Sequence, residues 1–268
     1  MGKRVQSPSS INTYKQCPRK YYYSYIAKLP TKDSIHLIRG SITHKVLEDF
    51  FKPNLGIFSQ EPNWKDMLLK RALSLFEQYW LQHRFQLASL NLNKEELSFY
   101  FEETKLMIVN WISFLNKKIE KEISKGSNFF EAFQKLTPLT EKEYNSEEHQ
   151  VRGFIDAIEE LDGNIRLMDY KTSKKFEITD EYKLQLAIYA LLYFEKHKKL
   201  PDHVGIYFLK GEERLLNVDE NLLKLAKFEI EQIHAATETD QIGDYPKKES
   251  PLCRWSTGEC DFYSTCKK

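Results

Sequence analysis

Two aspartates and a lysine lie where their side chains could do hydrolytic chemistry. Asp156 belongs to one strand-like run and Asp169 to the next, and Asp162-Gly163 between them is typical of a two-residue hairpin turn. With this turn, Asp156 faces Asp169 on neighbouring antiparallel strands, with Cβ atoms about 4.5–5.5 Å apart. Lys171 follows Asp169 by two residues and therefore points to the same face of the sheet. Opposed carboxylates are destabilising unless a cation lies between them, so this register predicts a cation-binding patch.

The chemistry that suits such a patch is metal-assisted hydrolysis of a phosphodiester bond. Mg²⁺ and Mn²⁺ prefer hard oxygen ligands, and proteins commonly bind them with one or two carboxylates, waters and a substrate phosphate. Such a metal acidifies a bound water and polarises the phosphate, while Lys171 could orient or deprotonate the water, or offset charge in the transition state. An ordinary ion pair between Asp169 and Lys171 on a solvated face is the alternative, and a turn shifted by one residue would break the register.

The four cysteines form a second group with chemical potential. Cys17 lies near the amino terminus, whereas Cys253, Cys260 and Cys266 fall in the last 16 residues. Disulfides are not expected in a reducing compartment, and scattered buried thiols would not cluster in this way. Structural zinc sites usually use close pairs such as C-x₂-C, and the spacings here, C-x₆-C and C-x₅-C, contain none. The pattern favours a cubane iron–sulfur cluster that ties the two ends of the chain together, with zinc and free thiols as alternatives.

Length and composition fit an intracellular globular protein with a packed core. The chain has 268 residues, of which 41% are hydrophobic and 13% aromatic. No apolar run reaches the roughly 18 residues of a membrane span, and the amino terminus lacks an apolar signal region, so we expect a cytoplasmic protein without a membrane partner. A net charge of +1 does not indicate nucleic-acid binding by itself. Basic residues and tyrosines do alternate between residues 3 and 32, where they could either follow a phosphate backbone or pack as a helix with buried tyrosines.

Hydrophobic periodicity predicts the elements that must position these groups. It indicates helices near residues 9–27, 41–51, 64–85, 94–123, 180–198 and 221–236, and strands near 139–144, 151–158, 165–171, 203–209 and 213–218. This order predicts an α/β fold with a mixed central sheet flanked by helices. We expect four segments: amino-terminal helices in 1–52, a helical insertion in 53–138, a core of sheet and helices in 139–240, and a cysteine-rich tail in 241–268 that acts as a terminal clip.

Six short motifs occur in order along the chain. They are S-x-x-x-Y-x-x-C-P-x-x-Y at 10–21, G-x-x-x-H-x-x-L-E at 40–48, G-x-x-D at 153–156, D-x-K at 169–171, Q-x-x-x-Y at 185–189, and the terminal cysteine triplet. Together they resemble the PD-(D/E)XK nuclease superfamily, specifically its RecB-like branch. That branch includes the nuclease modules of bacterial recombination helicase–nucleases and the small CRISPR-associated exonucleases of Cas family four. The family's tail usually reads C-x₂-C-x₅-C, and the four residues 256–259 are extra here.

The resemblance implies a restriction-endonuclease-like core and a role for each matched residue. The residues implied as catalytic are Asp156, Asp169, Lys171, Gln185 and Tyr189. The implied ligands of the catalytic metal are His44, Asp156, Asp169 and the backbone carbonyl of Tyr170. The implied ligands of a [4Fe–4S] cluster are Cys17, Cys253, Cys260 and Cys266. An imidazole beside carboxylates tilts the preference of the catalytic site toward Mn²⁺ over Mg²⁺, and Gln185 and Tyr189 face the same way because they are four residues apart on one helix.

The resulting hypothesis is an Mg²⁺- or Mn²⁺-dependent deoxyribonuclease that acts on single-stranded DNA or DNA ends, as an exonuclease more readily than as an endonuclease. The resemblance adds a helicase or CRISPR adaptation proteins as partners. A non-catalytic DNA-binding or assembly module that retains the nuclease fold is the alternative. The intact acid pair and lysine argue against it, because an inactive module has no need of opposed carboxylates.

Overall fold

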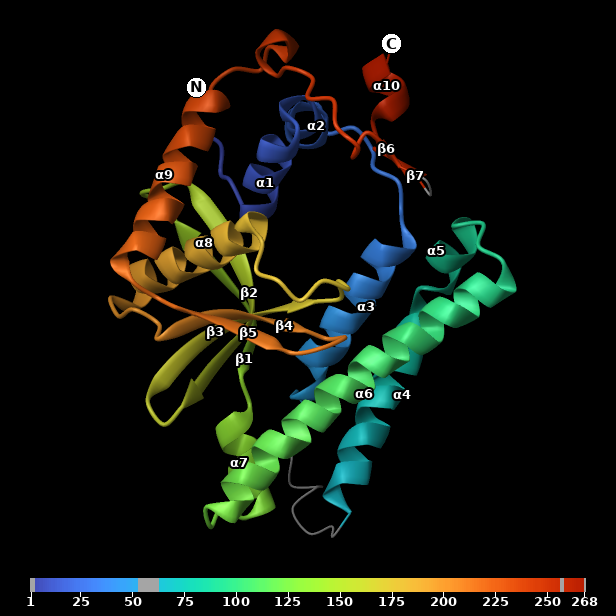
Figure 1. The fold of residues 1–268 in the computed structure, drawn as a ribbon, viewed down its shortest axis with the longest axis vertical. Coiled ribbons are helices and arrows are strands. Elements are labelled where there is room, and N and C mark those ends of the chain that lie inside the picture. The colour runs from blue at the N-terminus through green and yellow to red at the C-terminus, as the bar shows by residue number, and fades with distance from the viewer. Residues whose placement is uncertain (1–2, 53–62, 256–257, 268) are drawn as a thin grey trace.

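The structure, a computed structural model, describes residues 3–52, 63–255 and 258–267. A five-stranded mixed sheet in the order β1-β2-β3-β4-β5 forms its centre (Figure 1). The strands are β1 (Leu139–Ser146), β2 (Val151–Leu161), β3 (Asn164–Lys171), β4 (His203–Phe208) and β5 (Glu213–Asn217). Only β3 and β4 pair in parallel among the described strands of this sheet, and α8 (Asp180–His197) makes the crossover that a parallel pair requires. The predicted α/β class, with a restriction-endonuclease-like core, is confirmed.

The β2–β3 hairpin turns where the sequence predicts. Leu161 pairs with Asn164 across the turn. Asp162 and Gly163 both have positive φ, at 52° and 80°, as a two-residue hairpin turn that matches the twist of its strands requires. From the turn to the pair Ala157–Met168, the register of the two strands therefore follows the prediction.

Helices cover both faces of the sheet and form two buried cores (Figure 1). On one face α8 and α9 (Glu220–Ala236) pack against the sheet together with α1 (Pro8–Gln16). On the other face lie α3 (Ile35–Phe50), α4 (Trp64–Gln82), α6 (Lys94–Ser124) and α7 (Phe129–Leu136). Neighbouring residues of β4 illustrate the alternation, because Phe208 belongs to the first core and Tyr207 to the second.

The predicted first helix is broken in the structure. Instead of one helix over 9–27, α1 ends at Gln16, α2 covers Pro18–Tyr21, and a π-helix, η1, covers Tyr22–Ile26. Cys17 between them is extended, with φ −161°, because a proline disfavours the helical conformation of the preceding residue. The break turns Cys17 out of the helix and makes it available to the tail.

The helical block matches the prediction in its long helices and differs in its short ones. The Asn93 capping box opens α6 as expected, while α5 (Arg84–Ser89) and α7 are additional. The helix predicted over 41–51 begins earlier, at the Ser34 cap of α3. Residues 53–62 of the predicted insertion lie outside the described residues. The boundaries of the four segments stay a prediction, since one core cluster joins α3, the helical block and the sheet.

The tail returns to the amino-terminal helices (Figure 1). It comprises η3 (Ile242–Asp244), the short antiparallel pair β6 (Arg254–Trp255) and β7 (Gly258–Glu259), and α10 (Tyr263–Lys267). Arg19 holds the tail through its Nε, which donates to the Tyr245 carbonyl at 2.7 Å. Of the four extra residues, Gly258 and Glu259 form β7, and 256–257 lie outside the described residues. None of the described helices combines the length and the apolar composition needed to span a membrane.

Candidate active site and cysteine site

The two predicted acids lie at a fork between β2 and β3. The described ladder ends at the pair Ala157–Met168, so the expected direct pairing of Asp156 with Asp169 is not part of it. Instead, Oδ2 of Asp156 accepts a hydrogen bond from the backbone N–H of Tyr170 at 2.7 Å. Both acids line one cavity of about 320 Å³ and are 7% and 2% exposed. They thus meet across the opening of a fork rather than as partners in a continuous sheet.

Helix α3 brings His44 to the same fork. Its Nδ1 lies 3.3 Å from Asp156 Oδ2, and its Nε2 donates to the Tyr170 carbonyl at 3.0 Å. Burial lowers the pKa of His44, but the Asp156 carboxylate outweighs this and the pKa rises to about 10. Without a metal the imidazole is therefore protonated at neutral pH and donates from both nitrogens. His44 thus contacts two of the other groups implied as metal ligands, Asp156 and the Tyr170 carbonyl.

Asp169 and Lys171 form a buried ion pair. Lys171 Nζ lies 2.6 Å from Asp169 Oδ2, and the Asp169 side chain is only 2% exposed, so the ion pair is present but does not lie on a solvated face. Burial raises the pKa of Asp169 to about 6 against the opposing effect of Lys171. Burial also lowers the pKa of Lys171, but the charge of Asp169 outweighs this and the net shift is upward. The ammonium group keeps its charge beside the acid.

Helix α8 supplies two further predicted residues. Gln185 Nε2 lies 2.8 Å from Asp169 Oδ1 and 2.7 Å from the Tyr189 hydroxyl, so its amide holds the acid in one orientation. The helix approaches β2 closely at Gly153, where an added Cβ would lie 3.0 Å from the Tyr189 ring. This close approach explains why a glycine suits the first position of the G-x-x-D motif.

Glu141 is a site residue that the sequence analysis missed. It lies on β1 between the pairs Thr140–Ala157 and Lys142–Ile155, at the position across from Asp156. Its φ of 47° is unusual for a non-glycine residue and re-aims its side chain. Ligand atoms of His44, Glu141 and Asp156 all lie within 4.8 Å of one another. The turn between β1 and β2 has no two-residue signature, so the sequence did not reveal the register that brings Glu141 here.

The donor set of this fork fits a hard divalent cation. Carboxylate oxygens, a backbone carbonyl and one imidazole are the ligands that Mn²⁺ and Mg²⁺ accept. Oδ2 of Asp169 is buried without a hydrogen bond among the described residues, and Lys171 is its ion-pair partner. A bound divalent cation would take the place of the His44 proton as the positive charge beside Asp156.

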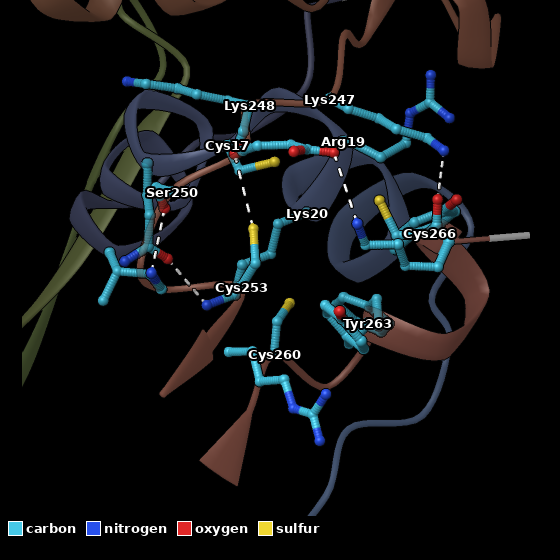
Figure 2. Close-up of a pocket in the computed structure, with 17 residues that line it drawn as sticks. Cys17, Arg19, Lys20, Lys247, Lys248, Ser250, Cys253, Cys260, Tyr263 and Cys266 are labelled. Atoms are coloured by element: carbon cyan, nitrogen blue, oxygen red, sulfur yellow. Dashed lines mark hydrogen bonds and ion pairs between the residues drawn. The ribbon is translucent and has the colours of Figure 1, made fainter. Parts of the chain in front are cut away.

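The four cysteines line a second cavity, of about 400 Å³ (Figure 2). Cys17 enters it from the break between α1 and α2, and the other three come from the tail. All four are free and partly buried, and burial raises the pKa of the Cys260 thiol. The backbone N–H of Cys260 donates to the Cys253 carbonyl at 3.0 Å, which shapes the tail around the cavity. The predicted meeting of the two chain ends is therefore present.

The spread of the thiols is wider than a zinc site requires. Zinc–sulfur bonds of about 2.3 Å in a tetrahedron place the sulfurs about 3.8 Å apart. No three of the four described sulfurs lie within 4.8 Å of one another. A cubane cluster holds its cysteines farther apart, because each thiolate binds a different iron. Four thiolates around one cavity are a donor set that fits an iron–sulfur cluster.

The fold, and the group of acids, histidine and lysine at the fork, are those expected of a metal-dependent nuclease. The family model of the PD-(D/E)XK nuclease superfamily matches residues 6–267, and the chain belongs to this superfamily.

Two phage proteins and one solved structure are similar to this chain. The chain is 25% identical over 293 residues to the gene 69 protein of Mycobacterium phage L5, an alignment that covers 98% of this chain and 96% of the relative. It is also 25% identical over 228 residues to the gene 69 protein of Mycobacterium phage D29, covering 78% and 76%. A provisionally assigned exonuclease of Eubacterium rectale shares the fold, with a TM-score of 0.52 and 12% identity over 98% of this chain and 92% of the other.

Proposed function

We propose that this protein is a divalent-metal-dependent deoxyribonuclease of the RecB-like branch, which hydrolyses phosphodiester bonds of single-stranded DNA or DNA ends. The observation that carries the proposal is the meeting of His44, Asp156, Asp169 and Lys171 in one cavity. The first three, with the Tyr170 carbonyl, would hold Mn²⁺ or Mg²⁺. Such an ion, when bound, supplies Lewis-acid activation of water and phosphate.

The chain's own residues would divide the remaining work. Gln185 holds the Asp169 carboxylate in place, and the Tyr189 hydroxyl accepts a hydrogen bond from the same Gln185 amide group. Lys171, whose side chain is 23% exposed, can donate to the attacking water and offset charge that develops on the phosphate oxygens. Digestion from an end is the mode we propose, in keeping with the provisional assignment of the Eubacterium rectale protein as an exonuclease.

A cleavage assay tests this function. Purified protein is incubated with labelled single strands, duplexes and circular single strands in Mn²⁺, Mg²⁺ or EDTA. We expect metal-dependent loss of linear single strands, circular strands being spared, and a fall of at least a hundredfold in Asp169→Asn and Lys171→Met. Glu143→Gln, a β1 variant outside the cavity, should retain activity. Activity that persists unchanged in both site variants would mean that another centre or a contaminant cleaves the DNA.

The second part of the proposal is a [4Fe–4S] cluster held by the four cysteines. Protein produced and purified without oxygen should be brown, absorb broadly in the violet and blue, and contain about four irons per chain with little zinc. A colourless protein with one zinc per chain would favour the zinc alternative. Partners such as a helicase or CRISPR adaptation proteins remain proposals that rest on the resemblance alone.

A further inference from the structure

An exposed aromatic ring and an exposed cation precede Asp156 on β2. The buried and exposed residues of β2 alternate before the acid, and the exposed ones are Arg152 and Phe154. Phe154 is 49% exposed, so the face of its ring is open to a ligand. The two-residue repeat of a strand is roughly 7 Å, so ring and guanidinium stand one step apart. Both line the same cavity as the two acids and Lys171.

Arg152 is available for a ligand. Its nearest described acid is Glu143 on β1, 4.0 Å away and itself well exposed, which is the outer limit of an ion pair. Such an exposed pair contributes little, so a phosphate can replace it. The guanidinium also matches phosphate oxygens in a bidentate geometry.

The cavity continues beyond Arg152. A neighbouring cavity of about 500 Å³ shares Ser7 and Arg152 with the cavity that contains the two acids. It is lined by the cations Arg4 and Lys28 and by Tyr25, a residue that is 37% exposed. The acid among its described lining residues, Asp240, is paired with Arg4. Aromatic and basic groups therefore line both cavities, which share Ser7 and Arg152.

We propose that Phe154 and Arg152 form a nucleotide subsite next to the reaction centre, in which Phe154 stacks on one base of a single strand and Arg152 binds a neighbouring phosphate. The single-stranded DNA then continues into the neighbouring cavity, where Tyr25 and Lys28 form another pair of one aromatic and one basic side chain. This inference rests on the proposed nuclease function and names the part of the site that selects single strands. A base inside a duplex has no free face for Phe154, whereas an unpaired base has one.

Binding, measured apart from cleavage, tests the subsite. Fluorescence anisotropy with labelled oligothymidylate in Ca²⁺ gives the affinity of wild type, Phe154→Ala and Phe154→Trp. We expect Phe154→Ala to weaken binding roughly ten- to a hundredfold and Phe154→Trp to retain it, since each stacked base contributes about 1–3 kcal/mol. Phe228→Ala is the matched control, because Phe228 is 57% exposed on α9 and lines neither cavity. Thermal melting checks that each variant is folded.

An abasic series makes the test specific for stacking. Oligonucleotides that lack one base at successive positions should reveal a position where the loss weakens wild-type binding, and Phe154→Ala should erase that dependence. Arg152→Ala should lower the slope of log affinity against log salt by about 0.7, the value for one phosphate contact on a single strand, and Arg152→Lys should restore it. An abasic profile unchanged in Phe154→Ala, or an equal loss in Phe228→Ala, would overturn the subsite. Cleavage by wild type would survive that result, whereas absence of any metal-dependent cleavage would defeat the nuclease proposal itself.

Discussion

At the scale of single residues, the local sequence predicted the position of a site residue where its motif lies within one turn or one strand. The hairpin signal at Asp162-Gly163 placed Asp156 and Asp169 near each other, although the structure joins them at a fork instead of a ladder. Glu141 escaped notice because its position depends on the β1–β2 register and on a positive φ, neither of which follows from local pattern. Whether the predicted residues act as ligands and catalysts stays a prediction.

Glu141 should contribute to metal binding. We expect Glu141→Gln to weaken Mn²⁺ affinity by about tenfold, because the change removes a negative charge near Asp156 without altering side-chain size. Titration followed by the EPR signal of free Mn²⁺ measures it without reference to cleavage. Glu143→Gln, two residues along β1, is the control and should bind Mn²⁺ as wild type does; equal affinities in the two variants would show that Glu141 takes no part.

At the scale of elements, long periodic segments were predictable and short or broken ones were not. The predicted α6, α8 and α9 differ from the structure by a residue or so at their ends, since a strong apolar stripe fixes them. The helices α5 and α7 are too short for their hydrophobic periodicity to be recognised in the sequence. The break at Cys17 follows from Pro18, a local signal that helical periodicity on either side obscured.

Two glycines should respond in opposite directions to alanine. Gly40 lies inside α3, and an added Cβ would meet nothing within 4 Å, so Gly40→Ala should raise the free energy of unfolding by about 0.5–1 kcal/mol. At Gly205 a Cβ would lie 2.7 Å from the Arg214 carbonyl oxygen and 2.5 Å from the Leu215 side chain. We expect Gly205→Ala to cost about 1–3 kcal/mol. Urea unfolding measures both; a destabilising Gly40→Ala would contradict the open space assigned to that face of α3.

At the scale of the whole molecule, the sheet separates two cores and the tail is held largely outside them. The predicted fold class could be read from element order, because alternating helices and strands with a crossover leave few arrangements. The arrangement of the helices α4 to α7 could not be read from the element order, since it depends on packing among α3, α4 and α6 that no local signal specifies. The cysteine spacing did predict that the chain ends meet.

Removal of the cluster should release the tail and leave the cores folded. In Cys17→Ser we expect loss of the visible absorption and faster tryptic cleavage at Lys247 and Lys248, which line the cysteine cavity, because the thiolates no longer hold the tail there. Far-ultraviolet circular dichroism should change little, since the two cores do not contain the tail cysteines. Ser264→Ala, an exposed change on α10, should resemble wild type. Equal cleavage of the two variants would mean that contacts other than the cluster secure the tail.

The proposed chemistry depends most on a divalent ion bound at the fork between β2 and β3. Crystals soaked in Mn²⁺ and measured at an energy where manganese scatters anomalously would locate it. We expect an anomalous peak within bonding distance of His44, Asp156, Asp169 and the Tyr170 carbonyl, and we expect Asp156→Asn to abolish this peak. A strong manganese peak elsewhere with none at the fork, or a peak that Asp156→Asn leaves in place, would contradict it.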